Sequence, residues 1–229
     1  HRHVDNNDKD PYSAKRGFWF SHIGWMLRHY QPATYNDYAN CRDLQKDNIV
    51  MWQHNHYVPL ALLMNIGVPV LLGVIYGDII GMLLVVGAVR LVLSHHTTFF
   101  INSLAHIWGS QPYTEKNTAR DNGILAVFTF GEGYHNYHHI FENDYRNGIY
   151  WWQYDPTKWF IKSCSWFGLT DKLRVSPQAK IEKAKALMLR KKAEDKIADL
   201  HNYHAMKEHL EAEYDLSLIH ISEPTRLRR

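Results

Sequence analysis

The chain has 229 residues, of which 45% are hydrophobic and 21% charged, and its formal net charge is +3. This nearly balanced charge argues against a dedicated nucleic-acid-binding protein, and the two cysteines, Cys41 and Cys164, form no ligand-like pair. The unusual features are 16 histidines and 14% aromatic residues. Because the sequence opens with His-Arg-His and no methionine, we expect the natural start to lie upstream.

The first 57 residues are polar and aromatic. The stretch from Asp5 to Pro11 is rich in turn-forming residues, and Ser13 to Tyr30 is an aromatic, amphipathic segment. Such a segment commonly lies at a membrane–water interface, with a helix of a protein core as the alternative. We therefore expect residues 1–57 to form part of a cytosolic cap with an interfacial helix.

Residues 58–106 predict two membrane-spanning helices. The nearly uncharged stretch Val58–Ile75 would be about 27 Å long as a helix, enough to cross a bilayer. After a short turn, Ile79–His106 would reach about 42 Å, so its end should project into water. The Lys and Arg residues that flank the pair lie beyond its outer ends and not in the turn between the helices, which predicts that both outer ends face the cytosol; they are Arg42, Lys46, Lys116 and Arg120.

The second of these helices contains Arg90, His95 and His96. Polar residues at membrane depth are costly and usually face protein or a cavity. Two interpretations stay open here. The residues line a tunnel or support a nearby site, or they pack against other helices.

Residues 107–175 predict a cytosolic cap, and they contain Gly-Glu-Gly-Tyr-His-Asn-Tyr-His-His at 131–139. On a helix, His135, His138 and His139 fall within an arc of about 100°, so we expect their rings to converge. Neutral imidazole suits Fe, Zn and Cu. A buried core would instead have to satisfy six ring nitrogens, so we favour a metal site over a structural role.

Further ligands are expected at the cytosolic end of the second spanning helix, where Asn102 and His106 are four residues apart and share a face. His1 is a third source. A soluble carboxylate-bridged diiron bundle would need two Glu-x-x-His motifs, whereas Glu132 and His135 supply only one. The neighbouring glycines also make a poor helix interior, so we expect a histidine-rich site.

The C-terminal part divides into two predicted segments. Residues 176–215 have the composition of a solvated, charged helix, whose three histidines lack a second cluster to support them. The tail, residues 216–229, resembles the in-frame translation of a transposon-end adapter used to prepare sequencing libraries. We therefore expect the native sequence to end near Asp215.

Taken in order, these motifs resemble those of the membrane-bound acyl-CoA Δ9 (stearoyl-CoA) desaturases, particularly the bacterial branch. His-x-x-His-His alone would be weak evidence, because hydroxylases and other desaturases carry it. The ordered set is more specific, and it comprises residues 10–25, Asn-Ser-Leu-Ala-His at 102–106, the 131–139 stretch, Asp-Tyr-Arg-Asn-Gly at 144–148 and Tyr-Asp-Pro-Thr-Lys-Trp at 154–159.

The resemblance implies an all-α, mushroom-shaped integral membrane fold with four spanning helices and a histidine-rich helical cap that holds two irons. Two of the four spanning helices would be present. His135, His138 and His139 would be the third histidine box, His106 an extra ligand, and Asn102 a residue that binds iron through water. His1 would be the last histidine of the second box. On this interpretation the chain is an N-terminally truncated fragment, inactive alone.

The implied reaction is an O₂-dependent dehydrogenation that introduces a cis double bond, Δ9 in type, into a saturated acyl-CoA. No catalytic residue is expected beyond the metal centre. Glu132, Asp121 and Asp144 are candidates to orient ligand rings, with helix capping or surface charge as the alternative. Two residues would line a narrow acyl tunnel, Thr98 and Phe99. Three cations would meet the CoA phosphates, with ordinary interfacial charge as the alternative: Lys15, Arg16 and Arg28.

The implied setting is a multi-pass protein of a lipid bilayer, the bacterial inner membrane, with its active site facing the cytoplasm. A separate ferredoxin or cytochrome b5, with its reductase, would supply electrons. Two alternatives remain. One is a diiron alkane or fatty-acyl hydroxylase on the same scaffold. The other is a non-catalytic membrane metal carrier with a site at His95 and His96.

Overall fold

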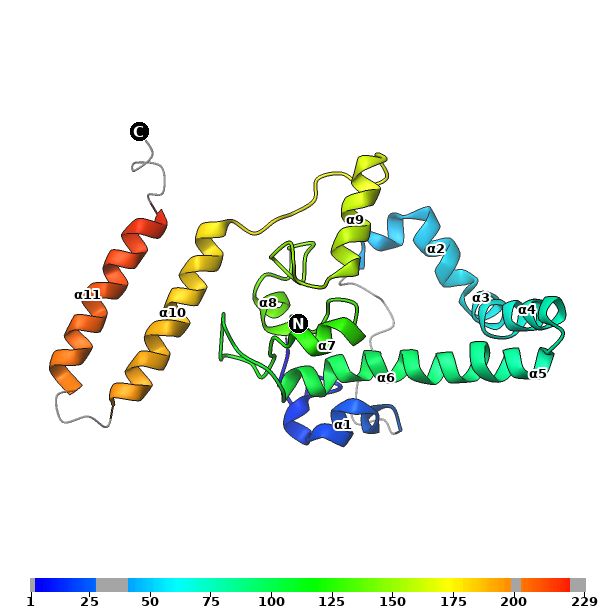
Figure 1. Cartoon of the computed structure of the whole chain (residues 1–229), viewed down its shortest axis with the longest axis horizontal. Helices are drawn as coiled ribbons and strands as arrows, with labels where there is room; N and C mark the ends of the chain where they lie inside the picture. The colour runs from blue at the N-terminus through cyan, green and yellow to red at the C-terminus, as the bar shows by residue number, and fades with distance from the viewer. Residues whose placement is uncertain (1–2, 28–40, 199–202, 223–229) are drawn as a thin grey trace. The chain divides into compact units, whose positions relative to one another are not determined.

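The computed structural model describes residues 3–27, 41–198 and 203–222, and the described residues are predominantly helical (Figure 1). Their only β pairings are isolated bridges that join Ser110 to Asp121 and Asp121 to Tyr134. Two compact units make up the chain, one from residues 1–24 and 100–229 and the other from residues 25–99. The helical character agrees with the all-α prediction.

Both predicted membrane spans are present as helices long and apolar enough to cross a bilayer, Tyr57–Tyr76 and Ile79–His106. They begin and end within one residue of the predicted bounds. The first comprises α3 (Tyr57–Leu62), the π-helix η5 (Leu63–Gly67) and α4 (Val68–Tyr76). The second comprises α5 (Ile79–Met82), the π-helix η6 (Leu83–Val89), α6 (Arg90–Asn102) and the 3₁₀-helix η7 (Leu104–His106).

The wide turn η5 has a local cause in Pro69, which follows it by two residues. A proline has no N–H to donate, and its ring crowds the carbonyl four residues earlier, here that of Asn65. Widening the helix into a π turn relieves that crowding. A Cβ on Gly87 of η6 would lie 3.2 Å from the Asn65 oxygen, so the two π segments lie against each other.

The turn between the spans is fixed by one glycine and one aspartate. Gly77 ends α4 in the left-handed conformation, at φ 80°, which costs glycine little. Asp78 then caps α5, because its side chain accepts a hydrogen bond from Gly81 N at 2.8 Å. The helices approach closely at Gly73, where an added Cβ would lie 2.5 Å from Ile79 Cα.

Arg90 bridges the two spans. Its guanidinium donates to Asn65 Oδ1 in the first span and to the Val86 carbonyl of its own helix. The Asn65 amide in turn donates to Ala61 O at 2.8 Å. His95 and His96 both contact the ring of Phe99, with centroid distances of 5.8 and 5.9 Å. For Arg90 these contacts favour the packing interpretation, since its partner lies on the neighbouring helix.

Short helices precede the first span in the chain. Instead of one interfacial helix, the N-terminal segment forms three pieces. Gly17, at φ 100°, separates the first two, and Ile23, at φ −141°, separates the second from the third. Exposed Trp19, Met26 and Leu27 contrast with buried Ser21 and His22, so the segment is amphipathic. The pieces are η1 (Ala14–Arg16), α1 (Phe18–His22) and η2 (Gly24–Met26), and η4 (Leu44–Lys46) and α2 (Asn48–Asn55) precede the first span.

The core of the other unit lies where α8 (His135–Ile140) meets α10 (Gln178–Ile197). Tyr113, Tyr137, Phe141 and Ile181 form its buried cluster. Because Tyr137 lies inside the histidine-rich stretch, this core holds that stretch in place. Helix α7 (Gly123–Phe128) precedes α8, and α9 (Pro156–Trp166) follows it.

The Asp-Pro break predicted at 155–156 is the start of α9. Pro156 takes the first helical position, and Asp155 caps the helix by accepting from Lys158 N at 2.8 Å. The same buried carboxylate accepts from the N–H groups of Asn147 and Gly148. The Lys158 ammonium donates to the carbonyls of Gly148 and Tyr150, at 2.7 and 2.9 Å. These contacts tie the 144–148 loop to α9.

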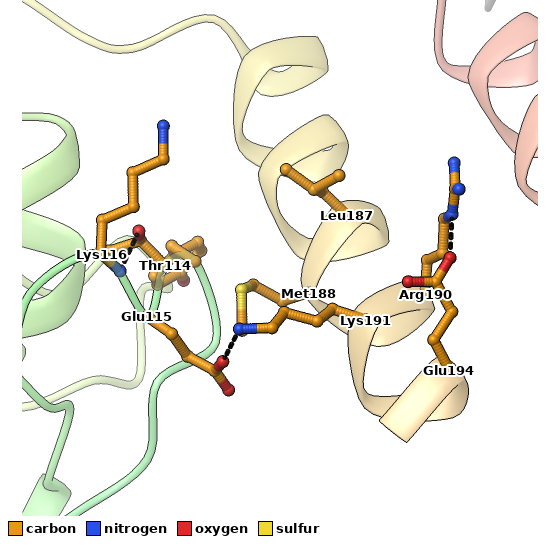
Figure 2. Close-up of a pocket in the computed structure, with 9 residues that line it drawn as sticks. Thr114, Glu115, Lys116, Leu187, Met188, Arg190, Lys191 and Glu194 are labelled. Atoms are coloured by element: carbon orange, nitrogen blue, oxygen red, sulfur yellow. Dashed lines mark hydrogen bonds and ion pairs between the residues drawn. The ribbon is translucent and has the colours of Figure 1, made fainter. Parts of the chain in front are cut away.

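The charged C-terminal segment forms two helices rather than one, α10 and α11 (Tyr203–Ser222), which lie side by side (Figure 1). Arg190 joins them, through an ion pair with Glu211 and a contact over the Tyr214 ring. A groove of about 450 Å³ separates α10 from the loop at 113–116, and the Lys191–Glu115 ion pair crosses it (Figure 2). The adapter origin of residues 216–229 stays a prediction.

Candidate metal centre

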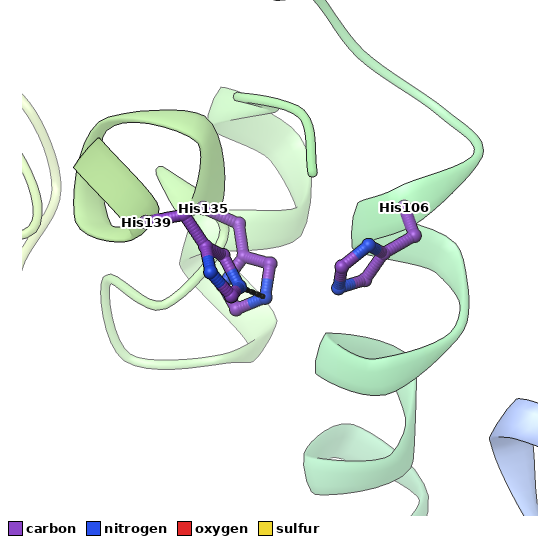
Figure 3. A group of neighbouring side chains, drawn as sticks. All are labelled: His106, His135 and His139. Atoms are coloured by element: carbon purple, nitrogen blue, oxygen red, sulfur yellow. Dashed lines mark hydrogen bonds between the residues drawn. The ribbon is translucent and has the colours of Figure 1, made fainter. Parts of the chain in front are cut away.

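Among the residues that the structure describes, one group of side chains has the composition and spacing of a metal site. It consists of His106, His135 and His139, whose candidate ligand nitrogens all lie within 4.8 Å of one another. We call this group the histidine trio. His106 comes from the end of a spanning helix, and the other two come from α8, with the rings facing one another (Figure 3).

The helix brings together only two of the three histidines in the box. His135 and His139 are one turn apart, with ring centroids 4.4 Å apart, whereas His138 lies 6.0 Å from each. Relative to position i, residue i+4 is rotated by about +40° and residue i+3 by about −60°. His138 therefore lies on a different side of α8 from His139, and it is not among the three residues whose candidate ligand atoms lie within 4.8 Å of one another. Its role as a ligand stays a prediction.

The trio fits a metal ion by its geometry. The Nε2 atoms of His135 and His139 lie 3.0 Å apart. Two nitrogens that each bind one ion at about 2.1 Å, at an angle near 90°, would be about 3.0 Å apart. In addition, the buried Nδ1 atom of His135 has no hydrogen-bond partner within the described ranges. That nitrogen is not the one that faces the ion in this geometry, so the fit rests on the Nε2 spacing and on the all-imidazole donor set.

Electrostatics keep these rings neutral, as metal ligation requires. Burial, reinforced by the neighbouring histidines, lowers the pKa of His135 well below its usual value. The same causes lower the pKa of His139 to about 3, and burial lowers the pKa of His138. At neutral pH each ring is therefore neutral, with one protonated nitrogen and one that can act as a ligand or hydrogen-bond acceptor.

His106 is held by a hydrogen-bond chain that sequence reasoning missed. Its Nδ1 atom lies 2.8 Å from the hydroxyl of Thr118, and that hydroxyl donates to Asp5 Oδ1 at 2.6 Å. The other oxygen of Asp5 accepts from Thr118 N, also at 2.6 Å. Asp5 precedes Thr118 by 113 residues, so no spacing rule links them.

Two glycines shape the loop that leads into α8. Gly131 adopts φ 106° and packs against Asp155, whose Oδ1 atom would lie 2.7 Å from an added Cβ. A Cβ on Gly133 would overlap the backbone of Ala126 in α7. Hydrogen bonds from Gly131 N to Ala126 O and from Asn122 N to Gly133 O, both 2.8 Å, complete the junction. As the sequence predicted, these glycines lie outside the helix, which begins at His135.

The two other residues of the box are structural. Asn136 is fully buried, and its side chain makes four hydrogen bonds, two from the N–H groups of Tyr113 and Thr114 and two to the carbonyls of Thr114 and Ala119. Tyr137 packs in the core and donates to Asp144 at 2.7 Å. Both residues orient α8 and leave its histidines for other contacts.

The three acidic candidates have different roles. Asp121 caps α8 by accepting from Tyr137 N at 3.0 Å, and burial raises its pKa to about 7 despite that bond. Glu132 accepts from Asn147 Nδ2 at 2.9 Å, and the Asn147 side chain also hydrogen-bonds to His138. Asp144 binds Arg146 and Tyr137 and does not reach a histidine. Capping is thus the observed role of Asp121, and ring orientation suits Glu132.

The remaining predicted site residues are spread over both units. Asn102 ends α6, half-buried, four residues before His106. Thr98 and Phe99 lie on α6 within the unit 25–99, where Thr98 donates to the Ser94 carbonyl. Lys15 and Arg16 are exposed on η1, and the Arg16 guanidinium lies 4.9 Å from the centre of the Phe20 ring. His1 and Arg28 lie outside the described residues.

Comparison with known proteins agrees with this constellation. The sequence profile described as "Fatty acid desaturase" matches residues 1–166. The chain belongs to the fatty acid desaturase family. The match covers both membrane spans and all members of the trio.

Individual desaturases are similar over most of this chain. A "Probable acyl-CoA desaturase" of Schizosaccharomyces pombe is 47% identical over 80% of the chain and 38% of its own length. "Acyl-CoA desaturase 1" of Saccharomyces cerevisiae is 44% identical over 87% of the chain and 39% of its own length. An "sn-2 palmitoyl-lipid 9-desaturase" of Nostoc is 34% identical over 77% of the chain and 61% of its own length.

Two consequences follow from these similarities. The chain spans about two fifths of the length of the two yeast relatives. The identities to the yeast proteins also exceed that to the cyanobacterial one, so they give no support to the expected bacterial branch.

Proposed function

We propose that this chain contributes to the metal centre of an O₂-dependent acyl desaturase that places a cis double bond, Δ9 in position, in a saturated acyl-CoA. The observation that carries the proposal is the histidine trio at the end of a helix long enough to span a membrane. A redox-active metal ion held close to the membrane would lie near the acyl chains of lipids, so this position suits oxidation of an acyl chain. The names of the yeast relatives favour CoA as the acyl carrier.

In this proposal His106, His135 and His139 hold one iron, and His138 with His1 contributes to a second. Asn102 acts through a water molecule. Iron, when bound, supplies the activation of O₂ that cleavage of an unactivated C–H bond demands. The protein holds the ligand rings neutral and buried, and it orients His106 through Thr118 and His138 through Asn147.

The choice of carbon atom then depends on how the acyl chain is held, because an oxidant this strong selects poorly among methylene groups. We assign Thr98 and Phe99 to the wall of the acyl tunnel, since both precede Asn102 on the same helix. Lys15, Arg16 and Arg28 are assigned to the CoA phosphates. The exposure of Lys15 and Arg16 on η1 supports this assignment.

We further infer a multi-pass membrane protein whose metal centre faces the cytoplasm, and an electron donor of the ferredoxin or cytochrome b5 type with its reductase. The distribution of basic residues around the two spans supports this orientation. O₂ reduction coupled to removal of two hydrogens from the substrate needs two further electrons, so a reductant is required by the balance of the reaction.

The test is expression of the complete coding sequence that contains this chain in cells unable to make unsaturated fatty acids. We expect a Δ9 cis-unsaturated fatty acid, detected by chromatography and mass spectrometry. His139→Ala should abolish it, whereas His209→Ala, an exposed histidine on α11, should not. A hydroxylated product would reject desaturation in favour of a hydroxylase. Purified protein that holds metal but neither oxidises lipid nor contains iron would support the carrier.

A further inference from the structure

The inference concerns Asp5 and Thr118, which lie behind His106 and which we call, with it, the Asp5 relay. Asp5 is 8% exposed and grips Thr118 with both oxygens, one on the backbone N–H and one on the hydroxyl. Because both oxygens of the Asp5 carboxylate accept from Thr118, they fix the backbone and the hydroxyl of Thr118 in position. The hydroxyl of Thr118 is thereby placed 2.8 Å from His106 Nδ1.

Counting protons along the relay determines the state of the His106 ring. An ionised carboxylate only accepts hydrogen bonds, and the 2.6 Å separation between Thr118 Oγ1 and Asp5 Oδ1 is that of a hydroxyl donating to a charged oxygen. A hydroxyl has a single proton, which this bond uses. Thr118 can therefore only accept from His106, so Nδ1 carries the ring proton.

The other nitrogen of His106, Nε2, is consequently left with its lone pair free. Figure 3 shows the His106 ring with its outer edge turned toward His135 and His139. A metal ion between the three rings would need that lone pair. The relay thus fixes both the orientation and the tautomer of His106.

Asp5 itself is held in a tight turn at residues 5–10. Its backbone adopts φ 65°, the left-handed region, which is uncommon outside glycine. Its N–H donates to Asp10 Oδ2 at 2.9 Å, and Asn6 Oδ1 accepts from Asp8 N and Lys9 N. Backbone conformations of this kind persist where surrounding contacts enforce them.

We propose that Asp5, acting through Thr118, is a positioning residue that holds His106 in the Nδ1–H tautomer, so that Nε2 is available to iron. This inference rests on the proposed function for the identity of the metal. The inference adds Asp5 and Thr118, which come from two distant segments, to the residues that support the metal centre. In this proposal neither residue contacts the metal itself.

Asp5→Asn is the most informative variant, because it keeps the size and shape of the side chain but reverses the direction of the hydrogen bonds from residue 5 through Thr118 to His106. The amide oxygen of Asn must face Thr118 N, since a backbone N–H can only donate. The NH₂ group is then left opposite the Thr118 hydroxyl and donates to it. The hydroxyl turns and donates to Nδ1 of His106, which shifts the ring proton to Nε2 and blocks ligation. An aspartate-to-asparagine change with this tautomer effect is known from serine proteases.

The experiment is an anaerobic titration of the iron-free, purified full-length protein with Fe²⁺, with metal analysis as an independent measure. Loss of a residue that orients a metal ligand typically costs about 10–100-fold in affinity. We expect a loss of that size for Asp5→Asn and for Thr118→Val. The double variant should bind no more weakly than either single variant, because the relay is already broken.

Two controls separate positioning from stability. Thr118→Ser keeps the hydroxyl and should retain Fe²⁺ affinity within about threefold. Asp8→Asn removes the same charge from an exposed position in the same turn and should change nothing. The iron-free Tm of Asp5→Asn should equal that of the wild type, whereas a merely structural role would lower it.

The outcomes are distinguishable. If wild-type protein binds no iron, the proposed function is wrong. If wild-type protein binds iron and Asp5→Asn or Thr118→Val binds it equally well, the relay is wrong and the proposed function stands. A lowered iron-free Tm together with additive losses in the double variant also overturns the relay.

Discussion

At the scale of single residues, adjacent positions in the stretch from His135 to His139 have different roles. The first and last residues of this stretch, His135 and His139, belong to the histidine trio. Between them, the buried Asn136 and Tyr137 hold the helix in place. A six-residue helix has little stability of its own. Its orientation therefore depends on side chains that never touch a metal.

Asn136→Asp tests this dependence. The substitution preserves shape but turns an oxygen toward the carbonyls of Thr114 and Ala119, where the NH₂ group donated. Leaving buried polar groups unpaired costs about 1–3 kcal/mol each, so we expect a loss of about 3 kcal/mol in unfolding free energy. Thermal unfolding of the purified protein measures it. Asn143→Asp, at an exposed position, should leave the Tm unchanged.

Asp144 predicts how stability depends on pH. Burial opposes its ionisation, but hydrogen bonds from Arg146, Ser176 N and Tyr137 outweigh burial and lower its pKa below the usual 3.8. A lowered folded-state pKa contributes stability above about pH 4, which is lost as the pH falls through the folded-state value.

We therefore expect Asp144→Asn to destabilise the protein near pH 7, on the order of 3 kcal/mol for breaking a buried pair, and the difference from wild type to shrink below pH 4. Unfolding measured from pH 7 to pH 3 checks this. Asp171→Asn, whose pair with Lys172 is exposed, should show no such trend. A difference that stays constant with pH would contradict the assignment.

Spacing along the sequence predicts the part of the site that lies on one helix, but not the contacts between distant segments. Residues on one helix have a fixed angular relation, so the His135 and His139 pair and the end-of-helix position of His106 were predictable. The acidic partners were sought close to the box, at Glu132, Asp121 and Asp144, because proximity along the chain was the available guide. Asp5 and Thr118 meet only in the folded chain, and neither residue type alone predicts that contact.

At the scale of elements, the pair of membrane helices was predictable, because a long uncharged apolar segment in a membrane must satisfy its backbone hydrogen bonds internally and therefore forms a helix. The π segments were not, although Pro69 supplies a local reason for one of them. The bond between Arg90 and Asn65 depends on both helices being in register. Small residues set that register by letting the backbones approach.

Gly73→Ala tests the close approach. The new Cβ would lie 2.5 Å from Ile79 Cα, a backbone atom that moves only if the helices separate. Overpacking of this kind costs about 1–3 kcal/mol. Gly67→Ala is the matched control, because its nearest neighbour is the flexible end of the Leu63 side chain at 3.0 Å. Thermal unfolding in detergent should separate the two, and equal Tm values would contradict the packing.

At the scale of the whole molecule, the chain combines a membrane hairpin with a polar helical unit, and the histidine trio belongs to the polar unit. Two spans joined by a short turn predict that residues 41–56 and 107 onward lie on the same side of a bilayer. Basic residues on both flanks then predict that this side is cytosolic.

Cysteine accessibility in intact cells checks that topology. In a background with Cys41 and Cys164 replaced by serine, Asp78→Cys should react with a membrane-impermeant maleimide added outside the cells or to the lumenal side of sealed vesicles. Lys116→Cys should react only after permeabilisation. The reverse pattern would invert the orientation.

The Asp5–Thr118 contact also has a consequence for biosynthesis. Its partners are 113 positions apart, and both membrane helices are translated between them. At about 5–20 residues per second, a ribosome needs roughly 6–23 s to proceed from one to the other. The hydrogen-bond chain behind His106 can close only after both membrane helices have been synthesised, and the partners from α8 follow later still. We therefore expect metal loading to follow membrane insertion, so that an iron-limited cell accumulates an inserted apoprotein rather than an uninserted chain.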